Sequence, residues 1–218
     1  MKWFYLLLLA WIVTGCVAAA TPTPTPVILV HASSATQPWL VDMYPCAEKY
    51  GIALEMVSPA AADISLRLGE SANLSVPAFQ LGNDEILVVT QPQTGMSSLT
   101  FDQVRAIYSG QITNWNEIGG SNLPIDVWTY ASGEDIRQIF DPVVLKGLRV
   151  IPSARVAMSA QHMSDNVGTN PGAIGFLPRR WKAGNTHETL LITTTPVLAY
   201  TKAEPNDNLE KVLACLQK

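Results

Sequence analysis

Short β-branched, apolar runs alternate along the chain with segments whose apolar residues recur at helical spacing. The runs that predict strands lie at residues 27–30, 52–57, 86–90 and 125–129. The segments that predict helices lie at residues 39–44, 100–108, 135–145, 159–167 and 208–217. Residues 190–200 form a longer β-branched and apolar stretch near the end of the chain. Alternation of this kind is typical of an α/β fold rather than of an all-β fold.

The segment that begins at Thr100 carries the clearest helix signal. Thr100 and Gln103 have the spacing of a capping box, in which each side chain bonds the backbone N–H of the other residue. Val104 and Ile107 then give the helix one apolar face, and Gly110 is placed to end it. We therefore expect a helix that packs one side against a core.

The beginning of the chain has the pattern of a targeting segment. Lys2 precedes an uncharged apolar run at 3–13, and small residues then lead into Cys16, as in a bacterial lipoprotein signal peptide. We expect a signal peptide at 1–15 and acyl chains on Cys16 that anchor the protein to the outside of the cell membrane. The alternative is an uncleaved transmembrane helix at 3–20, a stretch without charge. Both interpretations place the folded body outside the cytoplasm.

Residues 16–26 are expected to be a linker. Thr and Pro alternate over 21–26, and such sequence favours the extended polyproline II conformation. The folded body then begins near Val27 and has 218 − 26 = 192 residues, which fits one large domain or two smaller lobes. With 48% of the chain hydrophobic and 15% charged, a sizeable core can form.

Charge and motif content exclude several classes of function. The chain has 14 Lys and Arg against 18 Asp and Glu and no basic run, so we expect no nucleic-acid partner. Its histidines, His31, His162 and His187, are scattered, and neither an H-E-x-x-H nor a G-x-S-x-G pattern occurs. We therefore expect no enzymatic activity, no cofactor and no metal site.

The cysteines bear on topology. None lies in a C-x-x-C pair, which argues against a zinc ribbon or a thioredoxin-type site. With Cys16 acylated, Cys46 and Cys215 remain, and an oxidising compartment favours a disulfide between them. The alternative is two buried free thiols. If the pair forms, the first and last helices of the body share one lobe, and a chain that leaves this lobe and returns makes a hinged cleft.

Three segments resemble one family. Residues 99–120 (LTFDQVRAIYSGQITNWNEIGG) resemble the LTxxQVxxI(F/Y)xGxITNWxx(I/L)GG segment of phosphate-binding-protein-like solute receptors of ABC importers. Residues 170–176 (NPGAIGF) resemble their (N/D)PGAIG(Y/F) strand entry, and residues 33–38 (SSATQP) resemble their first STTxQP loop. The resemblance runs from about Val27 to the end of the chain.

This resemblance implies a two-lobe α/β fold of the type II periplasmic-binding class, with a ligand in the hinged cleft. It divides the body into lobe I at 27–90, lobe II at 91–185 and a return to lobe I at 186–218. It also implies a monomeric, lipid-anchored protein that delivers a small-molecule solute to an ABC permease. The expected solute is a small oxyanion such as phosphate.

The resemblance also implies the ligand-binding residues. In lobe I they are the hydroxyl residues Ser33, Ser34 and Thr36, because hydroxyls and helix amino termini bind an oxyanion without formal positive charge. Read from the residues alone, these hydroxyls are better explained as an ordinary helix cap, and only the long matched segment at 99–120 favours the ligand role. In lobe II, alignment on the family's GSGTRxxF motif points to Ser132, Gly133, Glu134 and Arg137.

Lobe II departs from the family pattern. Both possible alignments put the carboxylates of Glu134 and Asp135 in the first turn of a helix and leave Trp128 or Tyr130 where the family has an arginine. The family's contact residue in lobe I falls on Leu68, and Arg67 is a candidate to compensate as an anion donor.

The alternative interpretation is therefore a converted cleft with a non-phosphate ligand or a sensing or interaction role. In such a cleft the carboxylates meet an amine or cation. Four aromatic residues are then available for stacking or are core: Trp39, Trp128, Tyr130 and Trp181.

Overall fold

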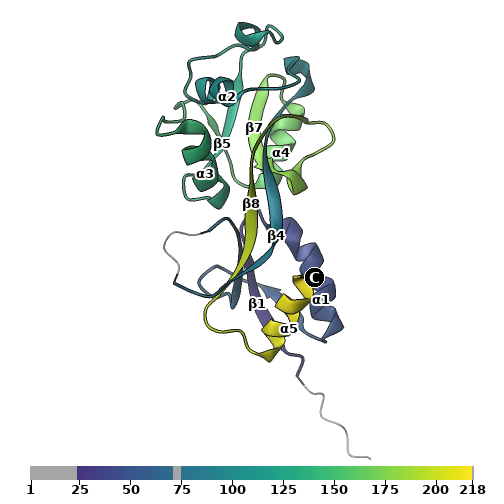
Figure 1. The fold of residues 1–218 in the computed structure, drawn as a ribbon. Helices are drawn as coiled ribbons and strands as arrows, with labels where there is room; N and C mark the ends of the chain where they lie inside the picture. Colours follow the sequence, from purple (N-terminus) through teal and green to yellow (C-terminus); the bar gives the residue numbers. More distant parts are fainter. Residues whose placement is uncertain (1–23, 71–74, 218) are drawn as a thin grey trace, which may run out of the picture.

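The computed structural model describes residues 24–70 and 75–217 as two lobes stacked end to end (Figure 1). The expected signal peptide, Cys16 and most of the Thr-Pro linker lie outside the described residues. Within the described ranges, no helix is both long enough and apolar enough to span a bilayer. The α/β architecture with two lobes agrees with the expectation from the sequence.

One eight-stranded sheet runs through both lobes in the order β2-β1-β3-β8-β4-β7-β5-β6. The lower lobe contains β1 (Val27–Ala32), β2 (Ala53–Met56) and β3 (Ile64–Leu68). The upper lobe contains β5 (Asp126–Tyr130), β6 (Arg155–Ala157) and β7 (Ala173–Pro178). The two long strands β4 (Ala78–Thr90) and β8 (His187–Thr201) connect the lobes.

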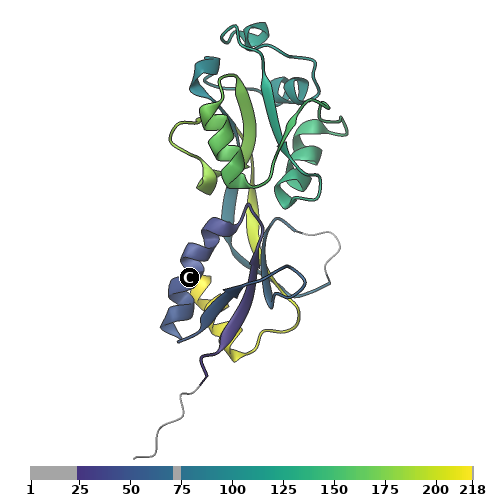
Figure 2. The same cartoon turned by 180° about the vertical axis from the view of Figure 1, so that it is seen from behind.

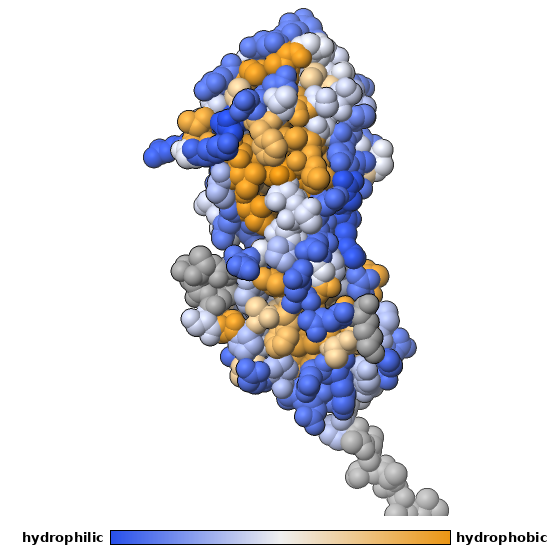
Figure 3. Space-filling view, viewed as in Figure 1, coloured by the Kyte–Doolittle hydropathy of each residue, from blue (hydrophilic) through white to orange (hydrophobic). Residues whose placement is uncertain are grey.

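In the described part of the chain, five α-helices pack on the sheet. The lower lobe has α1 (Leu40–Lys49) and α5 (Asp207–Leu216), and the upper lobe has α2 (Phe101–Tyr108), α3 (Asp135–Phe140) and α4 (Ala160–Thr169). Seen from either side, α1 and α4 lie on one side of the connecting strands and α3 on the other (Figure 2). Apolar residues gather on one face of the upper lobe, whereas apolar and polar residues are mixed where the lobes meet (Figure 3).

Short helical turns complete the chain: η1 (Gln37–Trp39), η2 (Pro92–Thr94), η3 (Trp115–Ile118), η5 (Arg179–Trp181) and the π-helical turn η4 (Asp141–Leu145). The helix expected at 135–145 is thus α3 continued by η4. Three features differ from the sequence expectation: β3 and β6 were not expected, and β4 is longer than the expected strand at 86–90. The added part of β4, residues 78–85, mixes apolar and polar residues and has no continuous apolar run that would predict a strand.

The sequence motifs on which the family resemblance rests stabilise the fold of the upper lobe. The capping box of α2 forms with both reciprocal hydrogen bonds, Gln103 N to Thr100 Oγ1 (3.2 Å) and Thr100 N to Gln103 Oε1 (2.8 Å). Trp115 is fully buried and donates from Nε1 to the carbonyl of Gly172 (2.9 Å). Gly172 has φ +81°, which a residue with a side chain adopts only with strain. The segments 99–120 and 170–176 therefore pack on each other in the upper lobe.

A disulfide stabilises the lower lobe, and a cluster of aromatic rings forms part of the core of the upper lobe. Cys46 of α1 and Cys215 of α5 form a disulfide with their Cα atoms 5.8 Å apart, so the first and last helices lie together in the lower lobe. In the upper lobe, the ring of Phe176 stacks on Phe140 at 3.8 Å and meets the edges of Tyr108 and Tyr130 at 5.9 and 5.2 Å.

The strands between the lobes bury an acid. Asp84 of β4 is 5% exposed, and its Oδ2 accepts a hydrogen bond from Trp39 Nε1 (3.3 Å). Burial raises the pKa of the Asp84 carboxyl above its ordinary value of 3.8, and the Trp39 hydrogen bond partly offsets this. Because the pKa is raised, this carboxyl's contribution to stability is largest below pH 3.8 and is lost as pH rises through the folded-state pKa.

We expect an NMR titration of the Asp84 side-chain carboxyl carbon to give a midpoint above 3.8. Trp39→Phe should move that midpoint further up, because it removes the donor that favours the charged form. Trp181→Phe is the matched control, since the indole of Trp181 donates to the carbonyl of Ala35 instead (3.1 Å). An Asp84 midpoint that falls in Trp39→Phe would contradict the assignment.

Candidate functional site

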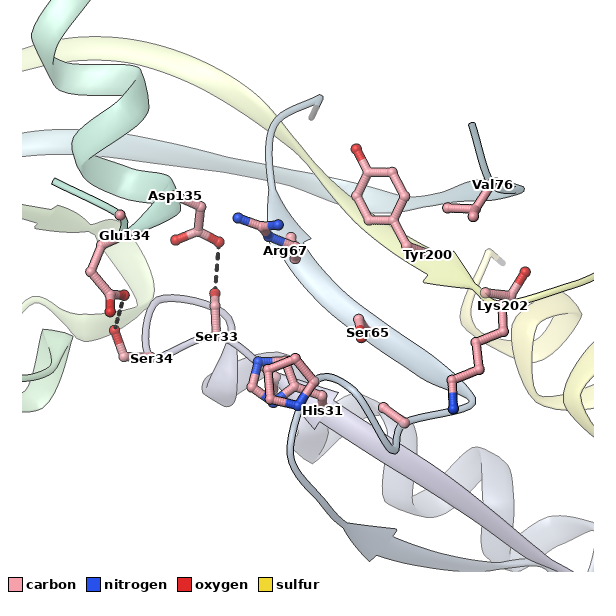
Figure 4. A pocket seen from close by; sticks show the side chains of 15 residues that line it. His31, Ser33, Ser34, Ser65, Arg67, Val76, Glu134, Asp135, Tyr200 and Lys202 are labelled. Atoms are coloured by element: carbon pink, nitrogen blue, oxygen red, sulfur yellow. Dashed lines mark hydrogen bonds between the residues drawn. The ribbon is translucent and has the colours of Figure 1, made fainter. Parts of the chain in front are cut away.

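A cavity of about 550 Å³ lies between the two lobes. The lower lobe lines it with His31, Ser33, Ser34, Ser65, Arg67, Tyr200 and Lys202, and the upper lobe lines it with Gly133, Glu134 and Asp135 (Figure 4). The loop after β1 and the start of α3, which the sequence comparison singled out, thus face each other across this cavity. Its volume lies within the range usual for small-molecule sites.

Asp135 reaches from the upper lobe to donors of the lower lobe. Its Oδ2 accepts hydrogen bonds from Ser33 Oγ (2.7 Å) and from the backbone N–H of Leu68 (2.9 Å). Its Oδ1 accepts from the backbone N–H of Ile136 (2.9 Å). The Asp135 side chain is thus hydrogen-bonded through both oxygens, as a buried carboxylate requires, and the residue is 4% exposed.

Glu134 makes a second, weaker contact across the same gap. Its Oε2 accepts a hydrogen bond from Ser34 Oγ at 3.3 Å, and the residue is half-buried (Figure 4). Both serines of the loop after β1 therefore bond to carboxylates of the upper lobe.

The loop after β1 is fixed by bonds to β3. The backbone N–H of Ser33 donates to the carbonyl of Leu66 (3.1 Å), and Thr36 Oγ1 donates to the same carbonyl (2.9 Å). Thr36 is fully buried and also contacts Ser33 Oγ at 3.1 Å. The hydroxyl of Thr36 thus positions the loop and is not among the groups that line the cavity.

Three basic side chains, those of His31, Arg67 and Lys202, also line the cavity. Lys202 donates from Nζ to the carbonyl of Ala61 (2.9 Å), and His31 Nδ1 lies 3.4 Å from the carbonyl of Val57. Arg67 of β3 is half-buried, and its guanidinium makes no ion pair or hydrogen bond with any described residue. Arg67 is therefore a cation available to a ligand.

Arg137 and Ser132 lie outside the residues that line the cavity. Arg137 turns away from it: the Nη1 donates to Thr129 Oγ1 (2.7 Å) and the carbonyl of Tyr130 (2.8 Å), and the Nε pairs with Asp141 (2.5 Å). These bonds tie β5 to α3. Ser132 is exposed on the connecting loop.

The aromatic residues considered for stacking also lie elsewhere. Trp39 and Tyr130 are buried, and the guanidinium of Arg180 lies over the ring of Trp39 at 3.9 Å. Trp128 donates from Nε1 to Asp126 Oδ2 (3.0 Å). Packing, rather than ligand stacking, accounts for the described contacts of these side chains.

Sequence reasoning missed Ser65, Tyr200 and Lys202. Ser65 lies on β3, Tyr200 on β8 and Lys202 directly after β8, and these strands pair antiparallel only because the chain returns to the lower lobe. No local pattern marks them. Across residues 24–70 and 75–217, no group of at least three His, Cys, Asp or Glu side chains could hold a metal ion.

The comparisons with known proteins agree with this architecture. The family model described as a PBP superfamily domain matches residues 69–214. The phosphate-binding protein PstS of Bacillus subtilis is 24% identical over 178 residues, which cover 69% of this chain. The chain spans only 56% of the length of that relative.

Two solved structures share the fold. A protein from Clostridium perfringens, crystallised with bound phosphate and assigned as a phosphate ABC transporter substrate-binding protein, superposes with a TM-score of 0.77 at 19% identity, covering 87% of this chain and 92% of its own. An ABC-type phosphate transport receptor from Vibrio cholerae superposes with a TM-score of 0.63 at 23% identity, covering 88% and 93%. Together with the family match, these findings show that the chain belongs to the PBP superfamily and has the fold of phosphate-binding-protein-like substrate-binding proteins.

Proposed function

We propose that this chain is the lipid-anchored, extracytoplasmic solute-binding component of an ABC importer and that its solute carries an oxyanion group. The observation that carries the proposal is the guanidinium of Arg67, which is half-buried and unpaired among the described residues at the wall of a cavity of about 550 Å³. A guanidinium offers a planar set of donors suited to carboxylate and phosphate groups.

The surroundings of Arg67 support an anionic ligand. Lys202 and His31 line the same cavity, and Ser65 adds a hydroxyl between them (Figure 4). The cavity has more room than a free phosphate needs, which favours a larger solute such as a phosphate ester or a small carboxylic acid. The relatives are named for phosphate, so free phosphate is the more specific ligand that they suggest.

A second candidate is a solute that carries an amine. Glu134 lines the cavity with a single hydrogen bond of 3.3 Å, so its carboxylate can accept another donor. A cleft that binds a cationic group at Glu134 corresponds to the alternative interpretation of the sequence, in which the ligand is not phosphate.

We expect Arg67→Gln to weaken binding of the oxyanion solute by about tenfold or more, because a hydrogen-bonded charge pair is lost. The measurement is a thermal-shift panel on the full chain in detergent, with phosphate, a phosphomonoester, a small carboxylate and a primary amine as probes. A ligand that binds only the folded form raises the melting temperature. Arg149→Gln, at an exposed arginine, is the matched control and should keep the full shift.

The panel also separates the candidates. A shift that appears only with the amine and disappears in Glu134→Gln would support the second candidate. A shift with an oxyanion that survives in Arg67→Gln would contradict the role given to Arg67.

A further inference from the structure

We infer that Asp135 is a built-in occupant of the lower lobe's anion seat: its carboxylate takes the place of a ligand oxyanion, joins the lobes and determines which solutes the cleft accepts. The anion seat is defined here as Ser33 Oγ and the backbone N–H of Leu68. This inference rests on the proposed function, because it takes from there that the ligand carries an oxyanion group.

The geometry of the seat is that of an oxyanion site. Ser33 follows β1 and Leu68 ends β3, yet both donate to one oxygen, Asp135 Oδ2, at 2.7 and 2.9 Å. Strands β1 and β3 are parallel neighbours, so these donors converge at one edge of the sheet. The acceptor comes from the other lobe, 102 residues away from Ser33 in the chain.

Both hydrogen-bond donors of the anion seat are used by Asp135. A serine hydroxyl and a backbone N–H each carry one hydrogen, so neither donor has a second bond to give while Asp135 accepts both. The Asp135 carboxylate makes no ion pair with a described residue. A free phosphate in this seat would have to displace Asp135 and would meet its negative charge.

Two consequences follow for the cleft. Solutes are selected for an anionic group that binds at Arg67 and leaves the seat to Asp135. The two lobes are also bridged on the cleft side without any solute, in addition to the bond from Trp181 to Ala35 and the Arg180–Asp42 ion pair (2.9 Å) between η5 and the lower lobe.

The test is Asp135→Ala in the full chain, titrated with inorganic phosphate by calorimetry. The freed donors should bind phosphate at least about tenfold more tightly than the wild type does. Ser33→Ala added to Asp135→Ala should remove the gain. Glu134→Ala is the charge control, because it deletes a neighbouring carboxylate without freeing the N–H of Leu68; its gain in phosphate affinity measures the lost charge alone and should be smaller than that of Asp135→Ala.

Hydrogen exchange provides a second measurement that needs no ligand. The amide of Leu68 should exchange at least about tenfold faster in Asp135→Ala and in the near-isosteric Asp135→Asn, since both lose the ionised acceptor. Added phosphate should restore protection in Asp135→Ala.

The inference is overturned if wild type and Asp135→Ala bind phosphate equally, or if the Leu68 amide exchanges at the same rate in both. Failure of the proposed function has a different signature: no oxyanion binds the wild type at Arg67, whatever Asp135→Ala does. Arg67→Gln leaves the contacts of Asp135 in place, so the two results are independent.

Discussion

Loss of the Cys46–Cys215 disulfide is expected to lower the free energy of unfolding by about 5 kcal/mol, the chain-entropy value for a loop closed over 169 residues. The bond joins the first and last helices of the lower lobe, so its removal frees nearly the whole folded body in the denatured state. Urea denaturation of the oxidised protein and of a Cys46→Ala, Cys215→Ala double variant measures the difference.

Reductant supplies the control for that experiment. It should destabilise the wild type toward the value of the double variant and leave the double variant unchanged. A loss below about 1 kcal/mol would contradict the expectation, because it would mean that the denatured chain gains little freedom when the loop opens.

Phe176→Ala is expected to lower the free energy of unfolding by about 3–5 kcal/mol, the usual range for a buried aromatic residue cut to alanine. Phe176 is fully buried, and its ring packs against those of Phe140, Tyr108 and Tyr130. Its removal would leave a cavity bounded by three large rings from three different elements. Such a cavity cannot collapse easily.

Denaturation of Phe176→Ala beside Val156→Ala checks this prediction. Val156 lies on β6 and is 54% exposed, so its truncation should change stability by no more than about 0.5 kcal/mol. A cost for Phe176→Ala as small as this would show that the aromatic cluster does not hold the upper lobe together.

Local signals in the sequence predicted much of the fold. The capping box at Thr100 and Gln103 depends on residues three apart, and it forms with both bonds. The strand β3 alternates between apolar and polar residues, whereas the strand predictions rested on continuous apolar runs and therefore did not include it. It is held in place by β1 on one side and β8 on the other, and this pairing is not local.

The sequence predicted which loops form the candidate site, but it did not predict the hydrogen bonds between them. The sequence identified the carboxylates of Glu134 and Asp135 as departures from the family. It could not show that Asp135 bonds Ser33, because that contact depends on how two lobes close on each other. Arg137 shows the converse: a motif residue expected at the ligand is held by Thr129 and Asp141, which surround it only in the folded upper lobe.

The chain passes from the lower lobe into the upper lobe on β4 and returns on β8, and these two strands are paired as far as Thr90 and His187. Everything between these residues enters and leaves the lower lobe through adjacent strands, as an insertion does. Swapping residues 91–186 for the corresponding segment of a relative would therefore keep the lower lobe's chain ends in register, and such chimaeras offer a direct way to transplant solute selectivity between members of the superfamily.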